Sequence, residues 1–302
     1  MRNILTEEKI QEIREYYLKK PITLEKMSRI FGFCTPTIRK ALGPGIKIYD
    51  KNRIYNPNLD EDFFQEIDNE YKAYFLGLII ADGNVYDPND TSHSTRHPGS
   101  KWVSITLHDY DQYMLGIFKH IIKLSSNVAS DGRGSSYVAV RSTKMANDLQ
   151  KYGIVQRKSF ITKFPFNVSP DMYRHIIRGI IDGDGSIDAF QTNVRNKFRH
   201  RITCCGTHRL MQEMIDVIVN GAELDFTPKV YDYKNKLLSE FRVTSINDMY
   251  KLGKWMYMDC HVFLERKYET FQKFVRHYGM EPVNAKCVIK QMTQGSIATE
   301  DT

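Results

Sequence analysis

Two aspartates, Asp82 and Asp184, stand at the same place in two closely similar stretches of the sequence. Each ends an apolar run and precedes a glycine, in FLGLIIADG over 75–83 and IRGIIDGDG over 177–185. Such a run predicts a buried helix that ends at the glycine, whose freedom to adopt positive φ presents the acid at the helix tip. Carboxylates at neighbouring tips repel unless a divalent cation neutralises them, and oxygen donors favour Mg²⁺.

The same stretches predict how the two helices meet. Gly77 and Ala81 are four residues apart, as are Gly179 and Gly183, so each pair lies on one helix face and lacks bulk. Helices with such faces can pack closely, which brings the two acids side by side. A single apolar helix ending in Asp-Gly is commonly just a buried helix with a good stop. The second copy, with matching flanks, is what favours a chemical role.

The segments around the two stretches also correspond, in the same order. Apolar alternation predicts strands at 102–107, 137–141, 229–233 and 240–244, and 199–204 matches the first of these. Each repeat therefore reads as helix, hairpin, helix, hairpin, helix. The expected fold is α+β with two αββαββα repeats, 61–165 and 166–280.

Three further residues stand out in this pattern. Lys158 and Lys267 occupy equivalent places in the two repeats, each after an arginine. Asp182 has no acidic counterpart, because Ile80 stands at the equivalent position. It is interpreted as a supporting or capping acid.

The predicted strands have two different faces. One face is apolar, and the other carries Arg, Thr, Tyr and Lys, which suits contact with phosphates and base edges.

The N-terminal part is distinct in charge. The chain has 302 residues, too many for one small domain, and a net charge of +7 with a pI near 9.0. Residues 1–60 hold 12 basic and 7 acidic residues, so most of the excess lies there. Three short amphipathic helices are predicted within 1–43. The third, over 35–42, has Thr35 as the expected N-cap.

These three helices resemble a helix-turn-helix DNA-binding module. The third would offer Thr37, Arg39 and Lys40 outward, anchored by Ile38 and Leu42, and such a helix fits the major groove. The same geometry also occurs in purely structural bundles. Residues 44–60 are expected to be a linker and 281–302 a loose tail.

Composition excludes several classes of protein. The longest apolar run, 74–81, is far shorter than a membrane span, and the charged N-terminus does not fit a signal peptide. Five cysteines without a C-x-x-C pair support neither a disulfide framework nor a structural zinc site. A soluble cytoplasmic protein is expected, associated with the nucleoid if its source is bacterial or phage.

The two stretches together resemble the LAGLIDADG signature of homing endonucleases in their single-chain, two-motif form. The resemblance covers about 61–275 and implies a monomer with a saddle-shaped sheet surface on a long asymmetric double-stranded DNA site. It implies Mg²⁺ or Mn²⁺, and cleavage of both strands across the minor groove that leaves short 3′ overhangs. Asp82, Asp184, Lys158 and Lys267 would be catalytic. Both acids would bind metal, together with the backbone carbonyls of Ala81 and Gly183.

Residues expected to contact DNA come from the outward strand parity, the hairpin starts and the third helix. They are Thr37, Arg39, Lys40, Asn84, Tyr86, Ser104, Thr106, Tyr137, Arg141, Ser186, Asp188, Arg199, Arg201, Thr203, Lys229, Tyr231 and Arg242.

Two other functions remain open from the sequence. A non-cleaving DNA-binding transcriptional regulator could retain this scaffold, although both acids and both lysines are present. An intron RNA maturase is the other, and it would bind RNA as well as DNA. An intein is disfavoured because the motifs are not embedded between splicing junctions. The target sequence and the host element, such as a mobile intron, cannot be read from the residues.

Overall fold

The computed structural model describes residues 5–46, 48, 56, 58–88, 100–193, 197–234 and 237–286. The chain divides into two compact units, one formed by 1–59 with 123–126 and the other by 60–122 with 127–302. Most of the predicted linker, and the predicted tail from residue 287 on, lie outside the described residues. In the described part of the tail, 281–286, Val283 is buried. In the part of the chain that is described, no helix is long and apolar enough to cross a bilayer.

The first unit contains three helices, α1 (Glu7–Lys19), α2 (Leu24–Phe31) and α3 (Thr35–Leu42). Gly32 has a φ of 71°, a left-handed conformation that ends α2 and turns the chain toward α3. Ile38 and Leu42 are buried, and Arg39 and Lys40 are exposed, as predicted. The expected N-cap was wrong by one residue, because Thr35 is already helical and Cys34 precedes it without a side-chain cap.

The second unit begins with a repeat that carries a four-stranded antiparallel sheet of order β1-β2-β4-β3. Its elements are α4 (Glu70–Asp82), β1 (Gly83–Tyr86), β2 (Trp102–His108), α5 (Gln112–Ile121), β3 (Ala129–Ser130), β4 (Ser135–Arg141) and α6 (Thr143–Lys151), followed by a short 3-10 helix (Lys158–Phe160). The predicted hairpins are both present in it.

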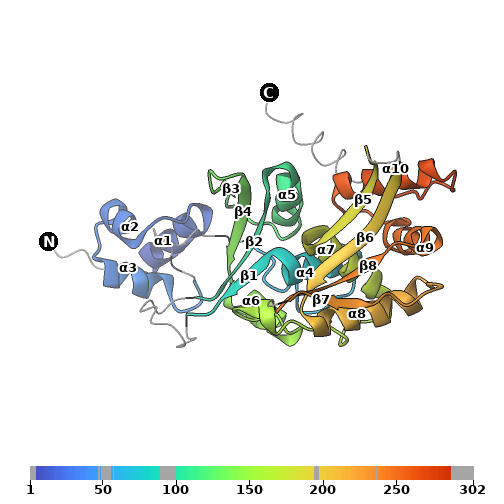
Figure 1. The fold of residues 1–302 in the computed structure, drawn as a ribbon. Helices are drawn as coiled ribbons and strands as arrows, with labels where there is room; N and C mark the ends of the chain where they lie inside the picture. Colours follow the sequence, from blue (N-terminus) through green and yellow to red (C-terminus); the bar gives the residue numbers. More distant parts are fainter. Residues whose placement is uncertain are drawn as a thin grey trace, which may run out of the picture. The chain divides into compact units, whose positions relative to one another are not determined.

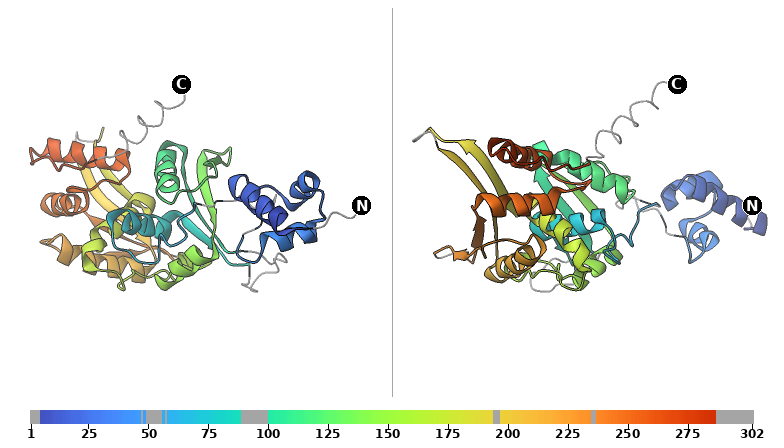
Figure 2. Two further views of the ribbon diagram at one scale, coloured as in Figure 1. Left: turned by 180° about the vertical axis from the view of Figure 1, so that it is seen from behind. Right: turned by 90° about the vertical axis from the view of Figure 1, so that its right-hand side faces the viewer.

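The following repeat has the same order of elements and a sheet of order β5-β6-β8-β7. Its elements are α7 (Tyr173–Asp184), β5 (Gly185–Gln191), β6 (Phe198–Gly206), α8 (His208–Gly221), β7 (Val230–Asp232), β8 (Ser239–Val243), α9 (Ile246–Tyr257) and α10 (Glu265–His277). Helix α10 was not predicted. The hairpin of β5 and β6 extends beyond the helices around it (Figure 2).

Helices α4 and α7 lie side by side in the middle of this unit, with one sheet on each side (Figure 1). They cross where two glycines meet, as the sequence predicted. A Cβ on Gly77 would lie 2.2 Å from the carbonyl oxygen of Ile176, and one on Gly179 would lie 2.2 Å from that of Tyr74. The backbones are thus in direct contact, which only glycine permits here.

The prediction of positive φ for the glycines that follow the two acids was wrong. Gly83 has φ −89° and Gly185 has φ −99°, both extended, because each helix runs directly into a strand. Glycine is needed there for space instead. A Cβ on Gly83 would lie 2.6 Å from the carbonyl of Ile79, and one on Gly185 would lie 2.6 Å from that of Ile181.

Candidate active site

Asp82 and Asp184 end the two central helices, and the helices bring them together. A Cβ placed on Gly183 would lie 2.3 Å from the Cβ of Ala81 and 2.9 Å from Oδ2 of Asp82. Asp82 is half-buried, whereas Asp184 has more of its surface exposed. The glycine-lined crossing therefore delivers two carboxylates to one place, each at the start of a sheet.

The electrostatics of this place favour a bound cation. Burial, reinforced by the nearby charge of Asp184, raises the pKa of Asp82 to about 6. Burial also raises the pKa of Asp184. Lys158 and Lys267 oppose both shifts by favouring the ionised carboxylates. The two lysines only partly offset the effect of burial and, at Asp82, of the neighbouring acid, so a further cation would stabilise the ionised carboxylates.

The two lysines approach the tips in different ways. Lys158 is 6% exposed and donates to the carbonyl of Ala81 at 3.1 Å. Lys267 is 4% exposed and donates to the carbonyls of Ile181, Asp182 and Gly185 at 2.6–2.7 Å. Burial lowers the pKa of both ammonium groups. Both predicted lysines thus lie at the ends of the motif helices.

The donor atoms available for a metal are all oxygens. Among the described residues, no group of three or more His, Cys, Asp and Glu side chains could hold a metal ion. Two carboxylates with adjacent carbonyls still suit Mg²⁺, which keeps several waters and takes one or two carboxylates together with substrate phosphates. Of the two predicted carbonyl ligands, that of Ala81 already accepts a bond from Lys158.

The raised pKa of Asp82 predicts an unusual effect on stability. An unfolded Asp titrates near 3.9, so between about pH 4 and pH 6 the folded state binds more protons. The free energy of unfolding therefore falls as pH rises through this window, by up to about 3 kcal/mol. Asp82→Asn should remove this penalty and make the protein about 1–2 kcal/mol more stable at pH 7.5 without metal, with no gain at pH 4. Denaturant unfolding at the two pH values measures it.

Asp148 provides a matched control with the opposite sign. Burial alone would raise its pKa, but Lys144 and Lys151 bond to both carboxylate oxygens and the net effect lowers the pKa. Asp148→Asn should therefore destabilise the protein at pH 7.5. If both variants lost stability to a similar extent, the ionised carboxylate of Asp82 would not destabilise the folded protein.

The predicted DNA-contacting residues of the sheets are mostly exposed. The exceptions are Ser104 and Thr203, which are 9% and 8% exposed. Both lie on central strands that pair with a neighbour on each side, so their outward exposure was overestimated. The exposed or half-buried members are Asn84, Tyr86, Thr106, Tyr137, Arg141, Ser186, Asp188, Arg199, Arg201, Lys229, Tyr231 and Arg242.

Two of these arginines are held by acids. Arg201 pairs with Asp188 across β5 and β6 at 2.5 Å, and Arg242 pairs with Glu240. The guanidinium of Arg242 also lies 5.6 Å from the ring centre of Tyr231. These contacts fix the side chains on the sheet surface before any ligand arrives, which lowers the entropy lost on binding. In the first unit, the Thr37 hydroxyl lies 3.1 Å from the Cys34 thiol.

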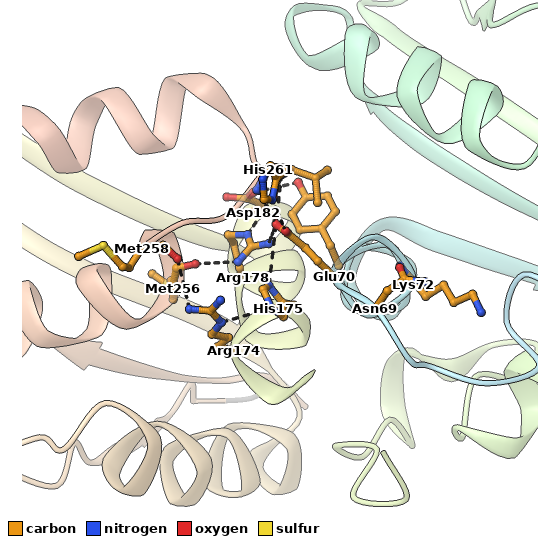
Figure 3. A network of polar contacts seen from close by, with 12 residues as sticks. Asn69, Glu70, Lys72, Arg174, His175, Arg178, Asp182, Met256, Met258 and His261 are labelled. Atoms are coloured by element: carbon orange, nitrogen blue, oxygen red, sulfur yellow. Dashed lines mark hydrogen bonds and ion pairs between the residues drawn. The ribbon is translucent and has the colours of Figure 1, made fainter. Parts of the chain in front are cut away.

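A buried polar network near the site was missed by the sequence reading. Arg178 is completely buried within α7 and pairs with Glu70 at 2.7 Å, and Glu70 also bonds His261 (Figure 3). The available signal was an arginine inside an apolar helix, since a buried Arg almost always has an acidic partner. The partner could not be identified, because Glu70 lies 108 residues away in sequence.

No family model matches the chain. A curated relative is the DNA-directed RNA polymerase subunit Rpo1C of Methanocaldococcus jannaschii, 26% identical over 170 residues, which cover 54% of this chain. The chain spans only 17% of that protein's length.

Solved structures with structural similarity are homing endonucleases on DNA. The meganuclease I-SmaMI bound to uncleaveable DNA is 12% identical with a TM-score of 0.47, and the match covers 76% of this chain and 94% of that one. The LAGLIDADG homing endonuclease I-GzeII with its DNA target is 12% identical with a TM-score of 0.48, covering 77% and 94%.

Proposed function

We propose that this protein is a divalent-metal-dependent DNA endonuclease of the homing type, which cuts both strands of a long asymmetric site as a monomer. The observation that carries this proposal is the pair of acids at the tips of two glycine-packed helices, with two buried lysines beside them. The motif resemblance and the basic, polar face of each sheet support it. The three-helix unit is proposed to act as a helix-turn-helix reader.

Each group at the site has a role in this proposal. Asp82 and Asp184 would hold Mg²⁺ or Mn²⁺, which when bound lowers the pKa of water and screens charge on the phosphate. The raised pKa values of the two acids mean that ionising them together is unfavourable without such a cation. Lys158 and Lys267 add fixed positive charge next to each tip, where it can stabilise the negative charge that builds on a phosphate under attack.

A plasmid library with random target sites, incubated with and without Mg²⁺, tests the proposal. Linear product that requires the metal and maps to one site is the expected result. Tight, site-specific binding without any cut would favour the regulator. Binding to structured RNA with the same affinity as DNA would favour the maturase.

The first unit should contribute affinity rather than chemistry. Deleting residues 1–43 should weaken DNA binding and reduce the log–log salt slope by about 3, as expected for about three lost phosphate contacts. Cleavage at high protein concentration should persist. Arg39→Ala/Lys40→Ala should reproduce part of the loss. Lys19→Ala/Lys20→Ala removes the same charge from the C-terminal end of α1 and should do less. Unchanged affinity of a folded truncated protein at every salt concentration would show that this unit does not read DNA.

The second repeat should tolerate fewer base changes in its half-site than the first. Its outward face carries Arg199, Arg201 and Arg242, and arginine pairs bidentately with guanine. Arg201→Ala should relax discrimination at one position by about 1–3 kcal/mol. Arg209→Ala is a matched control, because Arg209 is also ion-paired but lies on α8. Measuring cleavage of all single-base variants of the target tests both statements. If Arg201→Ala weakened cleavage of every variant equally, Arg201 would contact a phosphate and not a base.

A further inference from the structure

The two central helices differ at two positions that face the same way. Arg178 and Asp182 lie four residues apart on α7, whereas the equivalent positions of α4 carry Leu76 and Ile80. Both charged side chains are buried, at 0% and 1% exposure. Burying an ionisable group is costly unless strong hydrogen bonds compensate, and both side chains make such bonds to backbone groups outside α7.

Arg178 and its partner Glu70 bind the last turn of α9 and the segment that joins α9 to α10. Arg178 donates to the carbonyls of Met256 and Val262 at 2.6 and 2.9 Å, and to the Glu70 carboxylate at 2.7 Å. Glu70 in turn accepts from the backbone amides of His261 and Val262 at 2.7 and 3.2 Å. In Figure 3 these side chains converge on this segment from α4 and α7. The segment is therefore fixed from both central helices.

Asp182 binds the last residue before α10. Its Oδ2 accepts from the amide of Leu264 at 2.8 Å, and Leu264 is the N-cap residue of α10 without a side-chain cap of its own. A carboxylate at a helix N-terminus satisfies a free amide and interacts favourably with the helix dipole. Asp182 thus satisfies the backbone amide of the N-cap residue from a different helix and anchors the start of α10. The hydroxyl of Tyr74 donates to the same oxygen at 2.9 Å.

Anchoring the start of α10 also fixes the backbone of Lys267, which lies in the first turn of this helix. With α10 anchored, its ammonium is held by three carbonyls at the end of α7. Lys158 has a different setting, at the start of a short 3-10 helix after Arg157, whose φ is 58°. A single carbonyl bond of 3.1 Å holds it. The two lysines are therefore held with unequal rigidity.

We propose that Asp182 is a positioning residue that, together with Arg178 and Glu70, fixes α10 and so places Lys267 at one of the two scissile phosphates. The inference rests on the proposed nuclease function. Because the first repeat has apolar residues at the equivalent positions, this device acts on one strand only. Cleavage of one DNA strand then depends on Asp182, Arg178 and Glu70, and cleavage of the other strand does not.

Strand-resolved cleavage of an end-labelled target duplex tests this directly. Lys267→Met identifies the strand served by Lys267, and Lys158→Met identifies the other. Asp182→Asn, which keeps the shape of the side chain, should slow the Lys267 strand by about 10- to 100-fold, the effect of a misplaced catalytic group. The other strand should stay within threefold or so of the wild-type rate. Glu70→Gln weakens the same anchor from α4 and should slow the same strand.

Tyr74→Phe is the matched control, since it removes a hydrogen bond from the same buried carboxylate without touching α10. It should leave the strand ratio unchanged. Equal slowing of both strands by Asp182→Asn, or slowing of the Lys158 strand, would overturn the inference, as would equal effects of Lys267→Met on both strands. Absence of wild-type cleavage on any DNA with Mg²⁺ or Mn²⁺ would instead overturn the proposed function.

Hydrogen exchange provides a readout that does not depend on cleavage. Asp182→Asn should speed exchange of the amides at 264–268, the start of α10, whereas Tyr74→Phe should not. Unchanged protection there in the Asp182→Asn protein would show that Asp182 does not anchor α10, whatever its effect on activity.

Discussion

Asp184→Asn should abolish double-strand cleavage, by at least about 10³-fold, while DNA affinity stays within about tenfold. Asparagine has nearly the same shape as aspartate, so the crossing of α4 and α7 and the strand β5 that follows should remain intact. The lost contribution is a negative charge that holds metal and acts only when the phosphate reacts. Cleavage of the plasmid target with Mg²⁺, together with binding measured in Ca²⁺ or without metal, separates the two effects.

The companion variant Asp82→Asn should affect the two strands unequally, so that a nicked intermediate accumulates. Asp216→Asn makes the same change in net charge on α8 and should cleave normally. Linear product formed at the normal rate by the Asp184→Asn protein would remove this residue from the catalytic site. A loss of DNA affinity as large as the loss of cleavage would mean that Asp184 supports binding instead.

Much of the fold was readable because its signals are local. Apolar alternation gave the strands β2, β4, β7 and β8, and small residues four apart gave the close helix crossing. The duplication then placed the two acids, and likewise the two lysines, at equivalent positions of the two repeats. Such features depend on residue type and spacing, which a sequence displays directly.

The features that were missed depend on partners distant in sequence. The burial of Arg178 requires Glu70. A supporting or capping role was predicted for Asp182, but the group that it binds, the amide of Leu264, lies in the segment before an unpredicted helix. The extended φ of Gly83 and Gly185 likewise follows from the strand pairing after each helix, and the residue type alone suggested a turn. The pseudo-symmetry predicted equivalent places for the two lysines, but it did not show that Lys267 lies on a long helix and Lys158 at the start of a short 3-10 helix.

Gly179→Ala should destabilise the second unit by about 3 kcal/mol or more, enough to prevent folding in a marginally stable chain. The added Cβ would lie 2.2 Å from the carbonyl oxygen of Tyr74 and 2.8 Å from the amide nitrogen of Leu78. Both are backbone atoms, so no side chain can rotate away and the two helices must separate. Denaturant unfolding of the purified protein measures the loss.

Gly116→Ala is the matched control, because Gly116 lies inside α5 and a Cβ there would meet nothing within 4 Å. It should stabilise the protein by about 0.5–1 kcal/mol, the normal gain for alanine in a helix. If Gly179→Ala left the stability unchanged or raised it as Gly116→Ala does, α4 and α7 would not be in backbone contact.

The symmetry of the crossing makes the prediction stricter. Gly77 faces the carbonyl of Ile176 at the same 2.2 Å, and Ile176 is the repeat equivalent of Tyr74, so Gly77→Ala should destabilise to a similar extent. Once one Cβ has forced the helices apart, the second meets less resistance. The double variant should therefore lose clearly less than the two single losses combined, as expected for sites that share one contact. Strict additivity would place the two clashes in independent locations and contradict a single glycine-to-glycine crossing.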